Sequence, residues 1–264
     1  MSYFRNVVFI AALSGLAGGL VMTALQAYAT VPLILKAEVY EKAGEAHSHG
    51  ATDAKPAATM VQSTAAAQPA GHDHSTHTHA AKADEPKEEA WEPADGLERT
   101  SYTVLANIVT GIGFALVLVA LSEFAGGIAD WRAGIFWGFA GFTVFTLAPG
   151  LGLPPELPAM PAADLLQRQT WWIGTACATA AGLALIVFRR APWALVAGIA
   201  LIVVPHLIGA PQPDSHETPI PANLHHQFIV ASTMTNLVFW VLLGCVAGLV
   251  RGRFTSSSEQ LSLA

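Results

Sequence analysis

Charged side chains are scarce in this chain. Lysine, arginine, aspartate and glutamate together make up 12% of its 264 residues, whereas soluble domains carry about 25%. Hydrophobic residues make up 53%, and the mean hydropathy is +0.45. The composition is therefore that of a membrane protein and not of a soluble domain.

Several familiar motifs are also missing. There are only two cysteines, Cys177 and Cys245, both inside apolar blocks and without C-x-x-C spacing, so a disulfide framework is not expected. No G-x-x-x-x-G-K-[ST] occurs, which excludes ATP hydrolysis by a P-loop, and no H-E-x-x-H pairs metal ligands with a base on one helix. The apolar blocks contain no buried carboxylate, so the sequence gives no support for proton coupling.

Long apolar blocks dominate the chain. A helix needs roughly 20 residues at about 1.5 Å rise each to cross a hydrocarbon core. Six blocks meet this length, and we expect an all-α, polytopic helical membrane protein. The first block could be cleaved as a signal peptide after Ala27-Tyr28-Ala29, which would leave five spans. The six blocks are residues 7–29, 103–122, 131–151, 171–188, 192–209 and 227–250.

Basic residues predict the orientation of these spans. With both termini in the cytoplasm, each inner loop or end carries arginine, as the positive-inside rule requires; these residues are Arg5, Arg132, Arg189, Arg190, Arg251 and Arg253. All ten histidines then lie on the external side. The expected division is a first transmembrane helix at 1–29, an external His-rich loop at 30–100, a five-helix bundle at 101–254 and a cytoplasmic tail at 255–264.

The long loop is hydrophilic and contains two histidine-rich stretches. From about Ala43 to Ala90 it has almost no large apolar side chain, so we expect it to be largely disordered. Its "HSHG" and "GHDHSTHTH" stretches could wrap imidazoles around a transition-metal ion. The alternative is a low-complexity spacer without a metal role. The candidate ligands here are His47, His49, His72, Asp73, His74, His77 and His79.

A second group of histidines lies beside the last two spans. Prolines stiffen the segment between these spans, so we predict a rigid metal site at their outer ends. The alternative is structural, with His206 bonding to a neighbouring carbonyl group. The candidate ligands are His206, His216, Glu217, His225 and His226.

Polar residues recur at helical spacing within three spans, as Thr23, Gln26 and Thr30; Thr103, Asn107 and Thr110; and His225, Ser232 and Asn236. Each set predicts one polar helix face, which could either line a permeation path or form interhelical hydrogen bonds. The candidate path residues are Gln26, Asn107, Thr110, Ser232 and Asn236. Small residues four apart predict close helix contacts at Gly15/Gly19, Gly134/Gly138, Gly174/Ala178/Gly182 and Gly244/Gly248.

Three long stretches resemble a known family. "WEPADGLERTSYTVLANIVTGIGFAL" from Trp91, "GLPPELPAMPAADLLQRQTWW" from Gly152, and "PHLIGAPQP" followed by "PANLHHQFIVASTMTNLVFW" are similar to the CbtA-type cobalt transporter subunit. The resemblance implies a prokaryotic inner-membrane protein that takes up cobalt for cobalamin synthesis. It also implies a small CbtB-type partner with one membrane span and its own histidines. The family is often described with five spans, whereas this chain has six apolar blocks.

Together these patterns predict membrane uptake of a divalent transition metal by a non-enzymatic protein. The external histidines would capture Co²⁺, with Ni²⁺ or Zn²⁺ as alternatives, and the ion would pass inward along the polar helix faces. No permanently bound cofactor and no nucleic-acid partner are expected; the partners are the lipid bilayer, the metal ion and the CbtB-type subunit. The competing hypotheses are an integral-membrane metalloenzyme and a tethered metal buffer or sensor that uses the same histidines.

Overall fold

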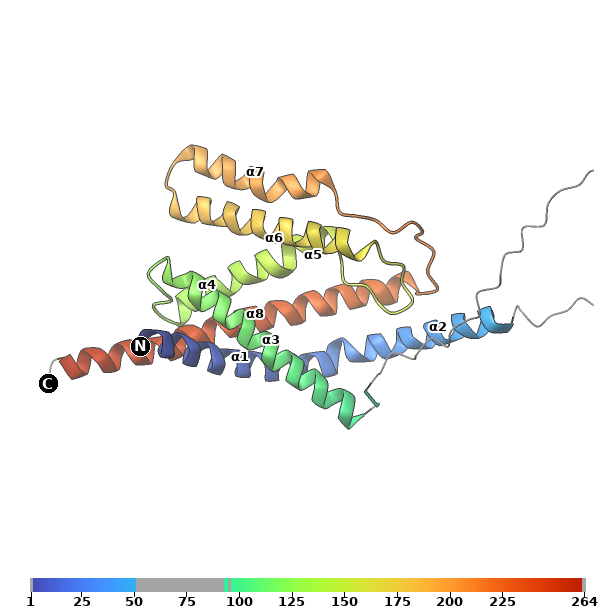
Figure 1. Cartoon of the computed structure of the whole chain (residues 1–264), viewed down its shortest axis with the longest axis horizontal. Helices are drawn as coiled ribbons and strands as arrows, with labels where there is room; N and C mark the ends of the chain where they lie inside the picture. Colours follow the sequence, from blue (N-terminus) through green and yellow to red (C-terminus); the bar gives the residue numbers. More distant parts are fainter. Residues whose placement is uncertain (1, 51–92, 95, 263–264) are drawn as a thin grey trace, which may run out of the picture.

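The regular structure is helical throughout the residues that the computed structural model describes, which are 2–50, 93–94 and 96–262 (Figure 1). One segment, η1, is a short π-helix. The described segments follow one another as α1 (Ser2–Ala29), α2 (Val31–Gly50), α3 (Leu97–Glu123), α4 (Trp131–Phe142), η1 (Thr143–Leu147), α5 (Ala148–Gly152), α6 (Leu165–Phe188), α7 (Pro192–Ile208) and α8 (Ala222–Ser262).

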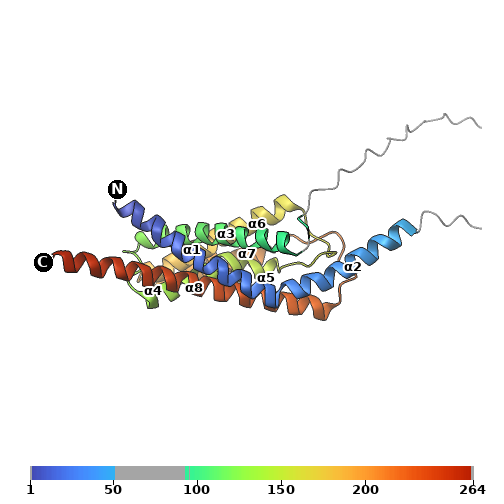
Figure 2. The ribbon, with the colours of Figure 1, turned by 90° about the horizontal axis from the view of Figure 1, so that it is seen from below.

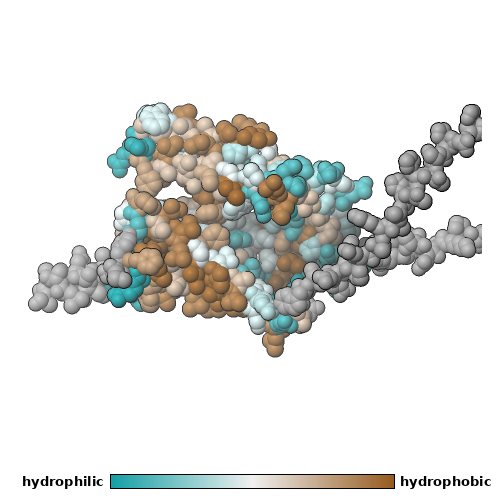
Figure 3. All heavy atoms as spheres, viewed as in Figure 1, coloured by the Kyte–Doolittle hydropathy of each residue, from teal (hydrophilic) through white to brown (hydrophobic). Residues whose placement is uncertain are grey.

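All six apolar blocks form helices, which confirms the predicted all-α fold. Five helical runs are long and apolar enough to cross a membrane: α1, α3, α4 through α5, α6 and most of α8. Helix α7 is strongly apolar but only 17 residues long. Figure 3 shows a band of apolar residues across the bundle, with hydrophilic residues gathered toward its two ends. The chain is a multi-pass membrane protein.

Helices α1, α3, α4 and α8 surround one apolar core. Large side chains from these helices are almost fully buried there; Trp240 is 2% exposed and Leu243 is fully buried. The buried members of this core are Ile10, Ala11, Ala115, Leu118, Val119, Ile128, Phe142, Phe239, Trp240, Leu243 and Ala247. We call these four helices the four-helix core.

Glycines bring the backbones of the four-helix core into direct contact. A Cβ atom built on Gly15 of α1 would lie 2.3 Å from the backbone of Ile112 in α3. One built on Gly244 of α8 would lie 2.0 Å from the carbonyl oxygen of Gly134 in α4. No larger side chain fits at these separations, so the predicted close contacts are confirmed at Gly15, Gly134 and Gly244.

A proline explains the π-helix in the middle of the third span. Pro149 has no N–H to bond the carbonyl group of Phe145, and its ring would clash with that carbonyl in a regular α-helix. The chain widens instead, and the N–H of Ala148 donates to the carbonyl oxygen of Thr143, five residues back. Such local π-turns accommodate an interruption without ending the helix.

The π-helix lies beside an aromatic cluster that joins several helices. The ring of Phe145 stacks on Trp240 of α8, with centroids 5.4 Å apart and planes only 4° apart. Phe114 of α3 contacts both rings, at 5.4 Å from Phe145 and 4.9 Å from Trp240. Trp172 of α6 lies 6.1 Å from Phe145. The cluster is the main aromatic link between the four-helix core and α6.

Helices α6 and α7 form an antiparallel hairpin at one edge of the bundle (Figure 1), as the three-residue connection at 189–191 predicts. They meet closely at Gly182, where an added Cβ would lie 2.6 Å from the carbonyl oxygen of Gly198. Outside the hairpin, α6 packs mainly on η1 and α5. The predicted contact at Gly174 is wrong: an added Cβ there meets nothing within 4 Å. Eight residues rotate a helix by about 80° beyond two full turns, which takes Gly174 off the face of Gly182.

Helix α2 was not expected, because its residues were assigned to the hydrophilic external loop. Alanine, glutamate and lysine, common in α2, are good helix formers, so low hydropathy did not imply irregular structure here. Leu33 and Ala37 of α2 are buried in a second apolar cluster with Leu157 and Leu224. Arg99 of α3 also contacts Glu38 of α2, with Nη2 and Oε1 2.7 Å apart. Residues 43–50, which belong to the stretch where disorder was expected, continue this helix.

The start of α1 and the end of α8 lie at the same end of the bundle (Figure 2). Near that end Arg251 of α8 forms an ion pair with Glu123 of α3, and its guanidinium lies against Gly127. The opposite end carries α2 and the connections 153–164 and 209–221. We call this opposite end the histidine end, because His206, His216, His225 and His226 lie there.

Candidate functional site

His206 is held by an aromatic contact, not by other predicted ligands. It lies in the last turn of α7 and is half-buried. Its ring meets Trp171 of α6 edge-on, with centroids 5.9 Å apart and planes at 71°. The indole Nε1 of Trp171 donates to the carbonyl oxygen of Pro205, 3.3 Å away. These two contacts fix the end of α7 against the start of α6.

His225 connects α8 to the loop that follows α5. Its Nε2 lies 3.2 Å from the carbonyl oxygen of Pro155. A carbonyl oxygen only accepts hydrogen bonds, so Nε2 carries the proton in this bond. In the neutral ring, the lone pair that can bind a metal is then on Nδ1. His225 therefore has a defined orientation and one nitrogen left for a ligand.

The remaining predicted ligands of the second group are exposed. His216 and Glu217 lie in the connection before α8, and His226 lies on the exposed side of its first turn. Adjacent residues are about 100° apart on a helix, which separates the ring of His226 from that of His225. The connection itself is anchored by Thr218, whose hydroxyl donates to the carbonyl oxygen of Ala159 at 3.3 Å.

The five predicted ligands do not form a prebuilt metal site. Within residues 2–50, 93–94 and 96–262, no three or more His, Cys, Asp or Glu side chains are close enough to hold an ion together. The described part of the chain therefore holds no preassembled cluster, and a metal role for these five residues stays a prediction. The physical reason is that His206 and His225 are each turned toward a different neighbour, and the other three face outward.

The histidines of the long segment are largely beyond the described structure. His47 and His49 fall within the backbone of helix α2, near its end. The other predicted ligands, which are His72, Asp73, His74, His77 and His79, lie outside the described residues.

Two of the predicted polar faces meet between α1 and α3. The amide nitrogen of Asn107 donates one hydrogen bond to Thr23 Oγ1 at 3.0 Å and another to Gln26 Oε1 at 2.6 Å. Both of its hydrogens are then used. The structure thus brings Gln26 and Asn107 together and confirms interhelical hydrogen bonding for these two faces. We call Thr23, Gln26 and Asn107 the amide cluster.

The other predicted path residues do not join this cluster. Thr110 is exposed on α3. Asn236 donates to the carbonyl oxygen of Ser232, 2.9 Å away in the same helix. Polar side chains in α8 therefore satisfy part of their hydrogen bonding locally, as Ser and Thr often do in membrane helices.

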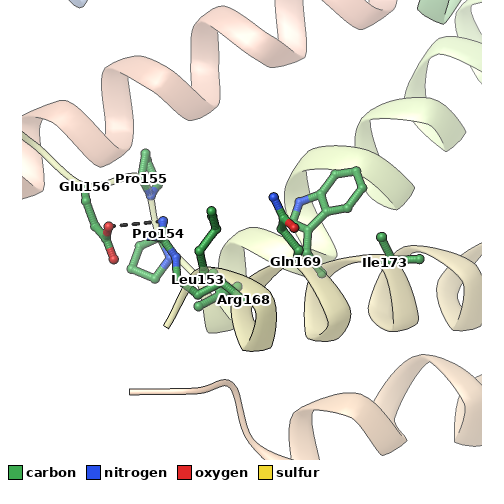
Figure 4. A pocket seen from close by; sticks show the side chains of 9 residues that line it. Leu153, Pro154, Pro155, Glu156, Arg168, Gln169 and Ile173 are labelled. Carbon is green, nitrogen blue, oxygen red and sulfur yellow. Dashed lines mark ion pairs between the residues drawn. The ribbon is translucent and has the colours of Figure 1, made fainter. Parts of the chain in front are cut away.

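A pocket at the histidine end was not predicted. It has a volume of about 470 Å³ and lies between the segment after α5 and the first turns of α6 (Figure 4). Its wall includes an ion pair in which Arg168 Nη2 lies 3.1 Å from Glu156 Oε2. The pocket is lined by Leu153, Pro154, Pro155, Glu156, Leu165, Arg168, Gln169, Trp172 and Ile173.

Two threonines of α6 were also missed. Thr175 and Thr179 are buried, with exposed fractions of 1% and 0%, and their hydroxyl oxygens have no hydrogen-bond partner among the described residues. Their spacing of four would have marked them as a fourth polar helix face. The face they share with Trp171 and Gly182 is the one that packs toward α7.

Chemically, the histidine end offers separated imidazoles and not a closed coordination sphere. The bundle below it offers amide and hydroxyl oxygens between helices. Such groups can exchange weakly bound cations, because each supplies only one ligand atom at a time.

The chain matches a known protein family. The model of a family described as "Probable cobalt transporter subunit (CbtA)" matches residues 4–251. No curated protein and no solved structure matches. The histidine end and the amide cluster both fall within the matched residues.

Proposed function

Because the chain belongs to the CbtA family of probable cobalt transporter subunits, we propose that it carries Co²⁺ into the cell across the bacterial inner membrane. The observation that carries this proposal is the family match, which spans almost the whole chain. The helical bundle supplies a compatible architecture, with several apolar spans and histidines gathered at one end. Ni²⁺ and Zn²⁺ are alternative cargoes, since imidazole binds these ions as well.

The proposed orientation puts both termini in the cytoplasm. Arg132 lies in the first turn of α4, Arg189 directly follows α6, and Arg251 lies in the last part of α8, at the end of the bundle where α1 begins. Arginines in short loops and ends favour the cytoplasmic side of a membrane. The histidine end then faces outward, where a metal ion would arrive.

Capture would use histidines that come together around the ion. His225 offers Nδ1 while its Nε2 remains bonded to Pro155. His216, Glu217 and His226 are exposed and can approach an ion at the surface, and His206 lies at the adjacent end of α7. The histidines of residues 47–79, together with Asp73, would raise the local concentration of metal. Ligands that come together only around the ion can also release it, as the transport of an ion requires.

Passage through the bundle would follow the amide cluster. The hydrogen bonds of Asn107 use only its amide nitrogen, and its Oδ1 has no partner within the described part of the chain. Amide oxygens can coordinate divalent cations. Ser232 and Asn236 of α8 and Thr110 of α3 are further proposed contacts along the path. The membrane potential would supply about 2.3 kcal/mol per elementary charge per 100 mV.

The word "subunit" in the family description supports a second chain. We propose that this second chain is the small CbtB-type protein, which has one span and its own histidines. It would supply further ligands to the ion that His206 and His225 begin to bind.

Cobalt uptake by liposomes that contain the purified full chain, with and without the small partner, tests the proposal. His225→Ala should lower uptake at limiting cobalt at least about tenfold, because a single lost ligand weakens a multi-ligand site strongly. His206→Ala should have a similar effect. His226→Ala is the matched control, since its ring is exposed one position away, and it should be milder. Wild-type uptake by both the His206→Ala and His225→Ala variants would remove the histidine end from the mechanism. Binding of cobalt without any uptake would favour a metal buffer or sensor.

A further inference from the structure

The pocket beside α6 has the size of a small-molecule site and not of an ion site. Its volume of about 470 Å³ lies within the roughly 300–1,000 Å³ typical of pockets that hold organic ligands. It contains one carboxylate, Glu156, which is already paired with Arg168, and no imidazole or thiol. Besides this paired carboxylate, a divalent metal would find one side-chain oxygen there, that of the Gln169 amide, whereas it needs several ligands.

The ion pair at the pocket leaves both hydrogen-bond donors and hydrogen-bond acceptors unused. The contact between Arg168 and Glu156 uses one guanidinium nitrogen and one carboxylate oxygen. A guanidinium has five donors and a carboxylate about four acceptor positions. Neither side chain makes another polar contact with the described residues. Both are partly accessible, with side-chain exposed fractions of 32% and 27%, and Gln169 adds an amide beside them (Figure 4).

The rest of the pocket is largely apolar, and part of its wall lies on the exposed side of α6. Leu165 and Ile173 form part of its wall and are 64% and 56% exposed. They belong to the outer turns of α6, a helix long and apolar enough to span the bilayer. Trp172 is also part of the wall, and tryptophan is enriched where helices leave the hydrocarbon. In a bilayer spanned by α6, a pocket beside these turns is expected at the level of the lipid headgroups, with its apolar side toward the hydrocarbon.

We propose that this pocket binds one phospholipid with a zwitterionic, ammonium-bearing headgroup. Arg168 would donate to the phosphate, and Glu156 would accept from the ammonium group. The start of an acyl chain would lie along Leu165 and Ile173. The opposite charges of the pair match those of the headgroup, and Arg is well suited to phosphate because its donors form a planar fork. This site does not depend on metal transport.

The site would also influence the histidine end. Pro155 lines the pocket and its carbonyl oxygen accepts the hydrogen bond of His225. Glu156 is the next residue. A lipid bound to Glu156 and Arg168 would therefore hold the segment that orients His225.

The test uses the full chain in detergent micelles, titrated with phosphatidylethanolamine or with phosphatidylglycerol carrying the same acyl chains. Native mass spectrometry counts bound lipids, and thermal unfolding reports their effect on stability. We expect one saturable phosphatidylethanolamine per chain, bound about tenfold more tightly than phosphatidylglycerol, because only the former offers an ammonium group to Glu156. Arg168→Gln and Glu156→Gln should each weaken this binding about tenfold. Glu38→Gln, which disrupts the ion pair between α2 and α3, is the matched control and should leave it unchanged.

Two further binding measurements complete the test. Ile173→Trp fills the pocket but keeps the ion pair, so it should also abolish the saturable binding even if the charge variants fold poorly. Phosphoethanolamine, the headgroup alone, should bind much more weakly than the whole lipid. Equal binding of both lipids, binding unaffected by Ile173→Trp, or equal affinity for the free headgroup would each overturn the proposal.

Discussion

The four-helix core and the α6–α7 hairpin are both built around close glycine contacts, but they bury very different side chains. The core buries Trp240, Leu243 and Phe142 from helices that touch one another along much of their length. The hairpin buries mostly small or polar residues, which are Thr175, Ala176, Thr179, Gly182, Ala194, Gly198 and Pro205. None of the residues that form the apolar core, as far as the structure describes the chain, comes from the hairpin.

The polar groups of the four-helix core and of the α6–α7 hairpin also differ. The core has the amide cluster between α1 and α3 and the ion pair between Glu123 and Arg251. In the hairpin, the hydroxyls of Thr175 and Thr179 are buried and have no hydrogen-bond partner among the described residues, which costs free energy. Pro205 also lacks the N–H that would bond the carbonyl group of Leu201 in α7. The core is thus the firmly held part of the molecule, and the hairpin is attached to it mainly through η1, α5 and the aromatic cluster.

The largest effect should come from breaking the core itself. Gly244→Leu places a side chain where even a Cβ would be 2.0 Å from the carbonyl oxygen of Gly134. Helices α4 and α8 cannot then approach, and we expect a loss of about 3 kcal/mol or more in the free energy of unfolding. Unfolding by sodium dodecyl sulfate in mixed micelles measures it. Gly174→Leu is the control, because an added Cβ there meets nothing within 4 Å. Equal loss in both variants would mean that close packing is not what holds the core.

A change in the hairpin should be smaller and should stay local. Gly182→Leu forces α6 away from Gly198 and Ile202 of α7. Part of the clash involves the flexible side chain of Ile202, so we expect a loss of about 1–2 kcal/mol. Hydrogen–deuterium exchange should speed up in α7 while α8 keeps its protection. Faster exchange throughout α8 would show that the hairpin and the core unfold as one unit.

The smallest effect should come from the amide cluster. Asn107→Leu removes the hydrogen bonds to Thr23 and Gln26, and such bonds in membrane proteins are worth about 0.6 kcal/mol on average. We expect the variant to lose about 1 kcal/mol in the same unfolding assay. Thr110→Val, an exposed position on the same helix, should change stability little. If Asn107→Leu were as stable as the wild type, the cluster would not contribute to holding the core together.

The spans were predictable because hydropathy alone determines which segments can cross a membrane. The close contacts at Gly15, Gly134 and Gly244 were predictable from their spacing, since residues four apart share a helix face. Helix α2 was missed because its hydrophilic composition was interpreted as disorder, although Leu33 and Ala37 carry an apolar face onto Leu157 and Leu224.

The candidate site was less predictable than the fold. Sequence places His206 and His225 at the same end of the bundle, but the direction of each ring depends on contacts with distant residues. Trp171 and Pro155 supply those contacts, and both come from segments separated from their histidines by tens of positions. The pocket was missed for the same reason, because its ion pair joins a loop to a helix.

The π-turn at η1 has a consequence for how the third span can change. Its hydrogen bond reaches back five residues and not four, so the turn holds one residue more than an α-helical turn. Each residue of an α-helix corresponds to a rotation of about 100°. One residue more in a regular helix would turn everything beyond it by roughly that angle, whereas the π-turn takes the residue up within one wide turn. Gly152, which leaves room for Trp171, therefore keeps its direction. Deleting one residue between Thr143 and Leu147 would close the wide turn but leave the ring of Pro149 against a carbonyl group of a regular helix, so the turn and the proline have to change together.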